Sequence, residues 1–215
     1  GFQLKLSKKI NRQTILLTIG IVFLANPFVV YLMQLNQLLN LPDSLEAIQI
    51  WMEISEQKAI QLTEAFLAMS SIGDLLINLF LIALIPAIGE ELLFRGVLQQ
   101  LFTKWTGKVH LAIFMSAFLF SAIHLQFFGF FPRLVLGLIL GYMFFWSQNL
   151  WLPILAHFTN NALAILFAYH FFADKIQIDF LNEETSVNIS AALISLLAVA
   201  LLMFLLHKNT SIKKG

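Results

Sequence analysis

The sequence predicts an all-α, polytopic membrane helix bundle with about six transmembrane spans and one interfacial amphipathic helix. Apolar residues make up 59% of the 215 residues, only 12% are charged, and the mean hydropathy is +0.83. Soluble domains average roughly 45–50% apolar and 25% charged residues. Several uncharged runs also approach or exceed the roughly 20 apolar residues that a membrane helix needs. We therefore expect residues 1–215 to form a single integral membrane domain.

The same composition excludes several other classes of protein. A soluble enzyme or a disordered chain needs far more polar surface than this sequence offers. The net charge is only +1, which is too small for a nucleic-acid binder. The chain has no cysteine, so disulfides, thiolate metal sites and a cysteine nucleophile are all excluded.

Runs without Asp, Glu, Lys or Arg predict the spans. The run 134–173 is long enough for two crossings, joined at the polar turn Ser147-Gln148-Asn149. Another crossing starts near Leu75 and contains charged residues from position 90 onward. The first run lacks a small-x-small cleavage site, so we expect a span rather than a cleaved signal. The predicted spans are residues 15–33, 75–102, 109–126, 132–147, 150–169 and 188–206.

The segment 44–66 has a different pattern. It mixes large apolar residues such as Ile48 and Trp51 with glutamates at intervals along the segment. This pattern predicts an amphipathic helix that lies on the membrane surface and connects the first and second spans.

The placement of charges predicts the orientation. Six crossings put both termini on one side, where the basic residues are Lys5, Lys8, Lys9, Arg12, Lys104, Lys108, Lys208, Lys213 and Lys214. The opposite loops carry Lys58, Lys175 and the acids Asp43, Glu46, Glu53, Glu56, Glu64, Asp174, Asp179, Glu183 and Glu184. Because basic residues collect on the cytoplasmic side, we expect both termini to be cytoplasmic, in a bacterial cytoplasmic membrane.

Three polar blocks interrupt the predicted spans: residues 90–95, 120–124 and 157–161. An ionisable group inside a span costs at least about 2.5–3.5 kcal/mol on insertion scales, so each block marks a candidate site. On a rise of about 1.5 Å per residue, the blocks lie roughly 10–21 Å from the cytoplasmic ends of three separate spans. Hydrogen bonding between helices is the alternative role for such residues. We predict that Arg133, at a span end, is an interfacial anchor.

Spacing within the first block separates two neighbouring carboxylates. Glu91 and Arg95 stand at i, i+4 and can pair on one helix face. Glu90 points about 100° away, so we expect that the same arginine does not neutralise it. Pro86 and Gly89 just upstream predict a kinked or locally opened helix.

The three blocks together resemble the CPBP intramembrane endopeptidases, which include CAAX prenyl endopeptidases of the Ras-converting type and bacteriocin-processing proteins. The family motifs are E-E-x-x-x-R, F-x-x-x-H and H-x-x-x-N/B, on separate helices in that order. The matching residues are Glu90, Glu91, Arg95, Phe120, His124, His157 and Asn161. The resemblance covers about residues 75–165, and we expect a family-like catalytic core over about 75–206.

The resemblance implies a role for each polar residue. Glu90 would be the general base that activates water, with help from His124. His157 and Asn161 would stabilise the oxyanion of the tetrahedral intermediate. Amide hydrolysis requires both a base of suitable pKa and preorganised donors, so these assignments are chemically sound.

Glu91 and Arg95 would orient and brace the site on the same analogy. Two histidines and a glutamate also suit zinc, but the H-E-x-x-H spacing of a helix-borne zinc site is missing. We therefore expect metal-free catalysis, with no certain cofactor and with zinc left open.

These expectations combine into an intramembrane endopeptidase that hydrolyses a membrane-associated or leader-bearing peptide by glutamate-activated water. Its expected partners are this peptide and the lipid bilayer, with no nucleic acid, and the oligomeric state stays open. The first alternative is a catalytically silent scaffold or regulator of another membrane protein. The second is a transporter with Glu90 as a proton relay, which the lack of internal repeats disfavours.

Overall fold

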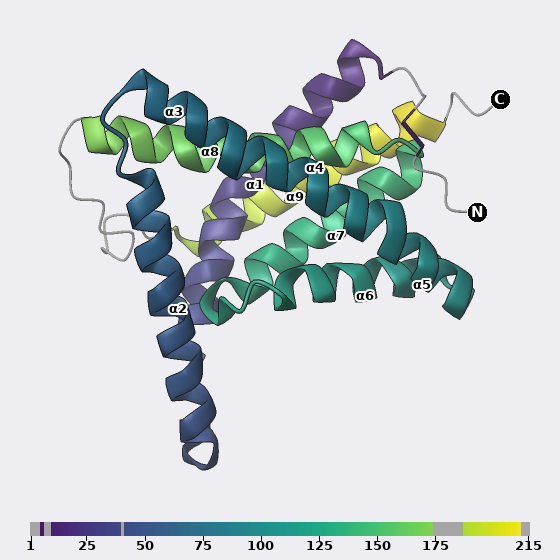
Figure 1. The fold of residues 1–215 in the computed structure, drawn as a ribbon. Helices are drawn as coiled ribbons and strands as arrows, with labels where there is room; N and C mark the ends of the chain where they lie inside the picture. The colour runs from purple at the N-terminus through teal and green to yellow at the C-terminus, as the bar shows by residue number, and fades with distance from the viewer. Residues whose placement is uncertain (1–4, 7–9, 40, 174–186, 212–215) are drawn as a thin grey trace.

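The computed structural model describes residues 5–6, 10–39, 41–173 and 187–211, and it confirms the predicted helical bundle. Figure 1 shows how the helices cross one another. They are α1 (Arg12–Gln37), α2 (Glu46–Leu67), α3 (Ile72–Asn78), α4 (Ile85–Glu91), α5 (Gln99–Thr106), α6 (Val109–Ala122), α7 (Phe130–Ser147), α8 (Trp151–Ala173) and α9 (Ile189–Ser211). Short 3₁₀ turns cover Asp43–Leu45 and Phe127–Gly129.

The helix that carries the first polar block is continuous from Ile72 to Thr106. It begins with a capping box, in which Ser71 Oγ accepts from the Asp74 amide and Asp74 accepts from the Ser71 amide. Wider π-helical turns at Leu79–Leu84 and Leu92–Leu98 flank α4. The opening that Pro86 and Gly89 predict is therefore spread over two π-helical segments, which are frequent at functional sites.

Among the described residues, five helical stretches are long and apolar enough to cross a membrane: Arg12–Gln37, Ile72–Thr106, Phe127–Ser147, Trp151–His170 and Ile189–Thr210. The sixth predicted span, 109–126, ends early. Helix α6 has 14 residues and rises about 21 Å, less than the hydrocarbon thickness of about 30 Å. The chain leaves the helix after Ala122, and Leu125 adopts a left-handed backbone with φ 53°.

Helices α1 and α9 form an antiparallel pair. Asn209 Nδ2 donates to Thr14 Oγ1 at 3.0 Å near one end. In the middle, Ser195 accepts from the Phe28 amide at 3.2 Å and donates to the Leu24 carbonyl. Because Pro27 interrupts the hydrogen bonds of α1, Ser195 satisfies backbone groups that would otherwise face a medium without water.

The start of α1 and the end of α9 lie on the same side of the bundle (Figure 1). An even number of crossings requires this arrangement. Many of the charges that predict a cytoplasmic location, namely Lys8, Lys9, Asp174, Lys175, Asp179, Glu183, Glu184, Lys213 and Lys214, lie outside the described residues. The orientation in the membrane therefore stays a prediction.

Helix α7 packs closely against α6 through two glycines one turn apart. A Cβ on Gly137 would lie 2.9 Å from Ala117 Cβ, and one on Gly141 would lie 2.8 Å from Ile113 Cγ2. Small residues at an interval of four let membrane helices approach closely. The approach brings the α7 backbone within reach of side chains on the Ile72–Thr106 helix.

The predicted amphipathic segment 44–66 forms α2, none of whose residues is buried. Figure 1 shows α2 running across the direction of α3 and α8 and extending away from the bundle. One contact with the bundle is the Trp51 ring, 5.1 Å from that of Phe127. This geometry agrees with a helix lying along a membrane surface, which remains a prediction.

Candidate active site

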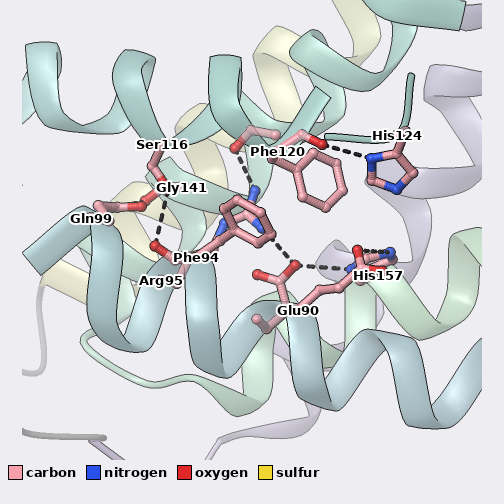
Figure 2. A network of polar contacts seen from close by, with 11 residues as sticks. Glu90, Phe94, Arg95, Gln99, Ser116, Phe120, His124, Gly141 and His157 are labelled. Carbon is pink, nitrogen blue, oxygen red and sulfur yellow. Dashed lines mark hydrogen bonds and ion pairs between the residues drawn. The ribbon is translucent and has the colours of Figure 1, made fainter. Parts of the chain in front are cut away.

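The three polar blocks meet where the Ile72–Thr106 helix faces α6 and α8 (Figure 2). Glu90 and Glu91 occupy the last turn of α4, and Arg95 lies in the following π-helical segment. His157 comes from the second turn of α8. His124 stands in the turn that follows α6. Residues far apart in sequence are thus gathered into one cluster.

The centre of the cluster is the carboxylate of Glu91. Its Oε1 atom accepts from Arg95 Nη1 at 2.7 Å and from His157 Nδ1 at 2.9 Å. The side chains of Glu91 and Arg95 are both fully buried. The predicted i, i+4 ion pair is therefore present, and it also anchors a histidine from another helix.

Arg95 extends this buried pair to two further helices. Its Nη2 atom donates to the Gly137 carbonyl of α7 at 2.8 Å. Its guanidinium lies 4.9 Å from the centre of the Phe120 ring of α6, a distance typical of a cation–π contact. Arg95 therefore stabilises the junction of the Ile72–Thr106 helix, α6 and α7.

Glu90 lies in a different environment from its neighbour. Its side chain is 28% exposed, and its Oε2 atom is 3.8 Å from His157 Nε2. That distance suits an ion pair but is too long for a direct hydrogen bond. Glu90 Oε2 has no hydrogen-bond partner among the described residues, so it is available to accept a proton or a hydrogen bond.

The hydrogen bond of His157 to Glu91 determines which of its ring nitrogens carries a proton. A carboxylate paired with arginine is an acceptor, so the His157 nitrogen facing Glu91 carries a proton. The other nitrogen, Nε2, is directed at Glu90. A buried carboxylate that holds an imidazole in one orientation is the arrangement found in catalytic triads.

His124 is oriented in the same manner by a backbone group. Its Nδ1 atom is 2.7 Å from the Phe120 carbonyl. A carbonyl can only accept, so Nδ1 carries the proton and Nε2 of the neutral ring is an acceptor. The Phe120 ring contacts both imidazoles, at 5.2 Å from His124 and 5.6 Å from His157. Figure 2 shows these two imidazoles on the same side of the cluster.

Asn161 lies beside the cluster and makes no hydrogen bond to it within the described part of the chain. It follows His157 by one turn of α8 and is half-buried. Its Oδ1 atom accepts from Asn160 Nδ2 at 3.3 Å, which leaves the Asn161 amide nitrogen as a donor. The structure thus places five of the six predicted site residues in one network and Asn161 next to it.

Sequence reasoning missed two polar residues that complete the network. Gln99 Nε2 donates to the Gly141 carbonyl at 3.1 Å, and Ser116 Oγ donates to the Phe94 carbonyl at 3.0 Å. The signal was available for Gln99, which follows Glu91 and Arg95 at intervals of four residues. Ser116 has no comparable pattern.

Arg133, which the sequence predicts to be an interfacial anchor, makes hydrogen bonds within the protein. Its guanidinium folds back on the preceding turn, where Nη1 donates to Gln126 Oε1 at 2.9 Å and Nη2 donates to the Gln126 carbonyl. The side chain is therefore engaged within the protein.

Within the described ranges, no group of three or more His, Asp or Glu side chains is arranged to hold a metal ion. His157 uses Nδ1 for Glu91, and His124 uses Nδ1 for a carbonyl. Neither bond uses Nε2, the nitrogen through which such histidines can bind a metal, so metal-free catalysis stays a prediction.

Comparison with known proteins identifies the family of the segment that carries the site. Residues 72–163 match the model of the type II CAAX prenyl endopeptidase Rce1-like family. This match includes all three polar blocks and confirms the resemblance to the CPBP intramembrane endopeptidases. The helices apolar enough to span a membrane support an integral membrane protein, in which the segment 72–163 is similar to CAAX proteases.

One curated relative is the uncharacterized protein YpbD of Bacillus subtilis (strain 168). It is 30% identical over 90 residues, which is 40% of this chain and 43% of that protein. The chain therefore matches less than half the length of this relative. No solved structure matches the chain significantly.

Proposed function

We propose that this protein is an intramembrane endopeptidase in which Glu90 activates water to hydrolyse a peptide bond. One observation carries the proposal. Glu90 is 28% exposed and has an unpaired carboxylate oxygen 3.8 Å from His157 Nε2, while the adjacent Glu91 is fully buried and its Oε1 atom is bound by Arg95 and His157. A carboxylate free to accept a proton beside two oriented imidazoles is what a general base for water requires.

The proposed reaction uses the acceptor atoms that have no hydrogen-bond partner among the described residues. In the proposed mechanism a water molecule binds between Glu90 and the acceptor Nε2 of His124, and Glu90 removes its proton as the oxygen attacks the carbonyl carbon. The carbon–nitrogen bond of the intermediate then breaks, and the proton held by Glu90 passes to the departing amine. One water is consumed, and a carboxylate and an amine are formed.

The developing oxyanion needs donors aimed at it. The amide nitrogen of Asn161 is available because its Oδ1 atom is engaged by Asn160. In the doubly protonated form of its ring, His157 would be a second donor through Nε2. Glu91 and Arg95 hold His157 in place and do not touch the substrate in this mechanism.

The substrate that we propose is a peptide held at the membrane, either by a lipid modification or by a leader segment. A cytoplasmic location of both termini, in a bacterial cytoplasmic membrane, completes the proposal and rests on the charge distribution of the sequence.

The test uses purified full-length protein in lipid nanodiscs and a peptide panel analysed by mass spectrometry. One arm contains farnesylated CAAX-type peptides, and the other contains unmodified leader-type peptides. Cleavage in either arm by the native protein supports the proposal and identifies the substrate class. We expect Glu90→Gln and His124→Ala to lower the rate about 10²–10⁴-fold, with helicity by circular dichroism unchanged.

Glu53→Gln on α2 is the matched control, because this exposed acid bonds only with Gln49 among the described contacts. It should leave cleavage unchanged. Full cleavage by Glu90→Gln would contradict the proposal. If neither arm is cleaved and a cellular phenotype survives Glu90→Gln, the scaffold alternative is correct. A chelator arm, followed by zinc addition, tests metal dependence, and we expect no effect.

A further inference from the structure

The turn of residues 123–129, between α6 and α7, carries His124 and is held by several other segments. We call it the His124 turn. Its backbone leaves the helix before α6 has risen through a full membrane thickness, so its amide and carbonyl groups need partners within the protein. Those partners come from residues distant from the three family motifs.

Asn36, in the last turn of α1, holds the far end of the His124 turn. Its Nδ2 atom donates to the Phe127 carbonyl at 2.7 Å, and its Oδ1 atom accepts from the Phe131 amide at 3.1 Å. The side chain is 5% exposed. A buried amide that satisfies a donor and an acceptor of one backbone segment fixes that segment in position.

Arg133, in the first turn of α7, holds the middle of the turn. Both of its terminal nitrogens donate to Gln126, one to the side chain and one to the carbonyl. The guanidinium lies directly over Gly129, where a Cβ would be 2.8 Å from Nη1 and 3.0 Å from Nη2. The φ of Gly129 is −110°, which other residues can also adopt. The glycine is therefore needed for the space that the arginine occupies and not for its backbone conformation.

Helix α2 adds a third contact. Glu56 Oε2 accepts from the Phe128 amide at 3.4 Å, and the Trp51 ring packs on Phe127. The negative charge of Glu56 also attracts the Arg133 guanidinium. Three elements outside the catalytic motifs thus converge on the seven residues of this turn.

We infer that Arg133 and Asn36 are positioning residues, which fix the His124 turn so that His124 Nε2 faces Glu90 and His157. The bond from His124 Nδ1 to the Phe120 carbonyl fixes the ring relative to α6 alone. The backbone after Ala122 is no longer helical, so its position depends on contacts with α1, α2 and α7. This inference rests on the proposed function, because it assigns these residues to the reaction through His124.

Two substitutions displace the arginine by independent routes. Arg133→Gln removes the guanidinium, whereas Gly129→Ala keeps it and places a methyl group where it now lies. A displacement of about 1 Å at a reacting group lowers the rate on the order of 10²-fold. We expect each variant to lower kcat on the peptide cleaved by the native protein by about that factor, with little change in KM. Arg12→Gln, at the exposed start of α1, is the matched control and should retain full activity.

A double-variant test separates positioning from a general loss of structure. In a His124→Ala background, Arg133→Gln should cause no further loss, because the residue being positioned is already absent. Additive losses would overturn the inference. Arg133→Lys should recover part of kcat, since one of the two bonds to Gln126 can still form. Asn36→Leu removes a different contact of the His124 turn, and in the same test it should behave like Arg133→Gln.

A spectroscopic readout needs no enzymatic activity. The chain has no cysteine, so Ile123→Cys, at a 56% exposed position of the turn, accepts one nitroxide spin label. Arg133→Gln and Gly129→Ala should increase the label's mobility, and Arg12→Gln should not. Unchanged mobility with unchanged kcat would refute the inference. Increased mobility without peptide cleavage by any variant, native protein included, would refute the proposed function while retaining the role of Arg133 on the turn.

Discussion

Glu90 and Glu91 are adjacent in sequence and belong to two differently built halves of the polar cluster. The closed half contains Glu91, Arg95 and Gln99, which are buried and bonded to neighbouring helices. The open half contains Glu90 and the Nε2 atoms of the two histidines. The comparison teaches that one helix turn can provide both a structural carboxylate and a reactive one, because successive residues face about 100° apart.

The closed half has the character of a structural junction. Its charges are paired, and its hydrogen bonds end on α7 carbonyls exposed by Gly137 and Gly141. Among the described residues, both halves contain acceptors without a partner, namely Glu91 Oε2 and Gln99 Oε1 in the closed half and Glu90 Oε2 in the open half. Only Glu90 combines such an acceptor with partial exposure, which proton transfer to water requires. Stability and reactivity should therefore respond to different substitutions.

The largest effect is expected from breaking the closed half. Arg95→Leu leaves the buried Glu91 carboxylate without its cation, and removing one partner of a buried pair costs about 3–5 kcal/mol. We expect a large fall in the free energy of unfolding, measured by steric trapping in lipid, together with loss of peptide cleavage. The double variant Glu91→Leu/Arg95→Leu should recover stability without activity, because His157 loses the acceptor that orients it. Full stability of Arg95→Leu would show that the pair is not structural.

A smaller effect, confined to activity, is expected at Asn161. Asn161→Ala removes a proposed oxyanion donor, and loss of one such donor costs about 10²–10³-fold in kcat. Stability should change little, because Asn161 makes no hydrogen bond to the closed half in the described chain. Thr159→Ala, whose hydroxyl bonds the Leu155 carbonyl of the same helix, is the neighbouring control and should keep full activity. An equal loss of activity in both variants would argue against a specific role for the amide.

The smallest effect is expected from helix spacing. Gly141→Ala places a methyl group 2.8 Å from Ile113 Cγ2 and 3.1 Å from Gln99 Oε1, and overpacking of this kind costs typically about 1–3 kcal/mol. Unfolding measurements in lipid should detect the loss. Gly89→Ala is matched in chemistry, and its methyl group would contact nothing within 4 Å. Equal stability of the two variants would mean that α6 and α7 separate easily.

Much of the fold follows from composition and periodicity. The long apolar runs predicted the helices α1, α7, α8 and α9 and the Ile72–Thr106 helix to within a few residues of their ends. The pattern of segment 44–66 predicted α2. The early end of α6 was not predicted, because residues 120–126 contain no Pro, Gly or formally charged residue and the turn is stabilised by distant partners such as Asn36.

A similar part of the candidate site could be predicted from the sequence. Charged and amide residues inside apolar runs identified the three blocks, and the interval between Glu91 and Arg95 predicted their pairing. The role of Gln99 was missed although its interval from Glu91 and Arg95 was visible. The contacts of Arg133 were not predicted, because an isolated arginine at a span end has several ordinary explanations. Their hydrogen-bond partners are mostly backbone carbonyls, which leave no mark in a sequence.

The sequence by itself determined that the chain is a helical membrane protein and that its costly polar residues fall into three blocks. It did so because hydropathy and helical periodicity are local properties of the chain. Only the tertiary structure decided that the buried pair also binds His157 and the Gly137 carbonyl, which nitrogen of each histidine is left as an acceptor and what holds the His124 turn. Those outcomes depend on distances between helices, and such distances are set by packing at glycines and by hydrogen bonds between residues far apart in the chain.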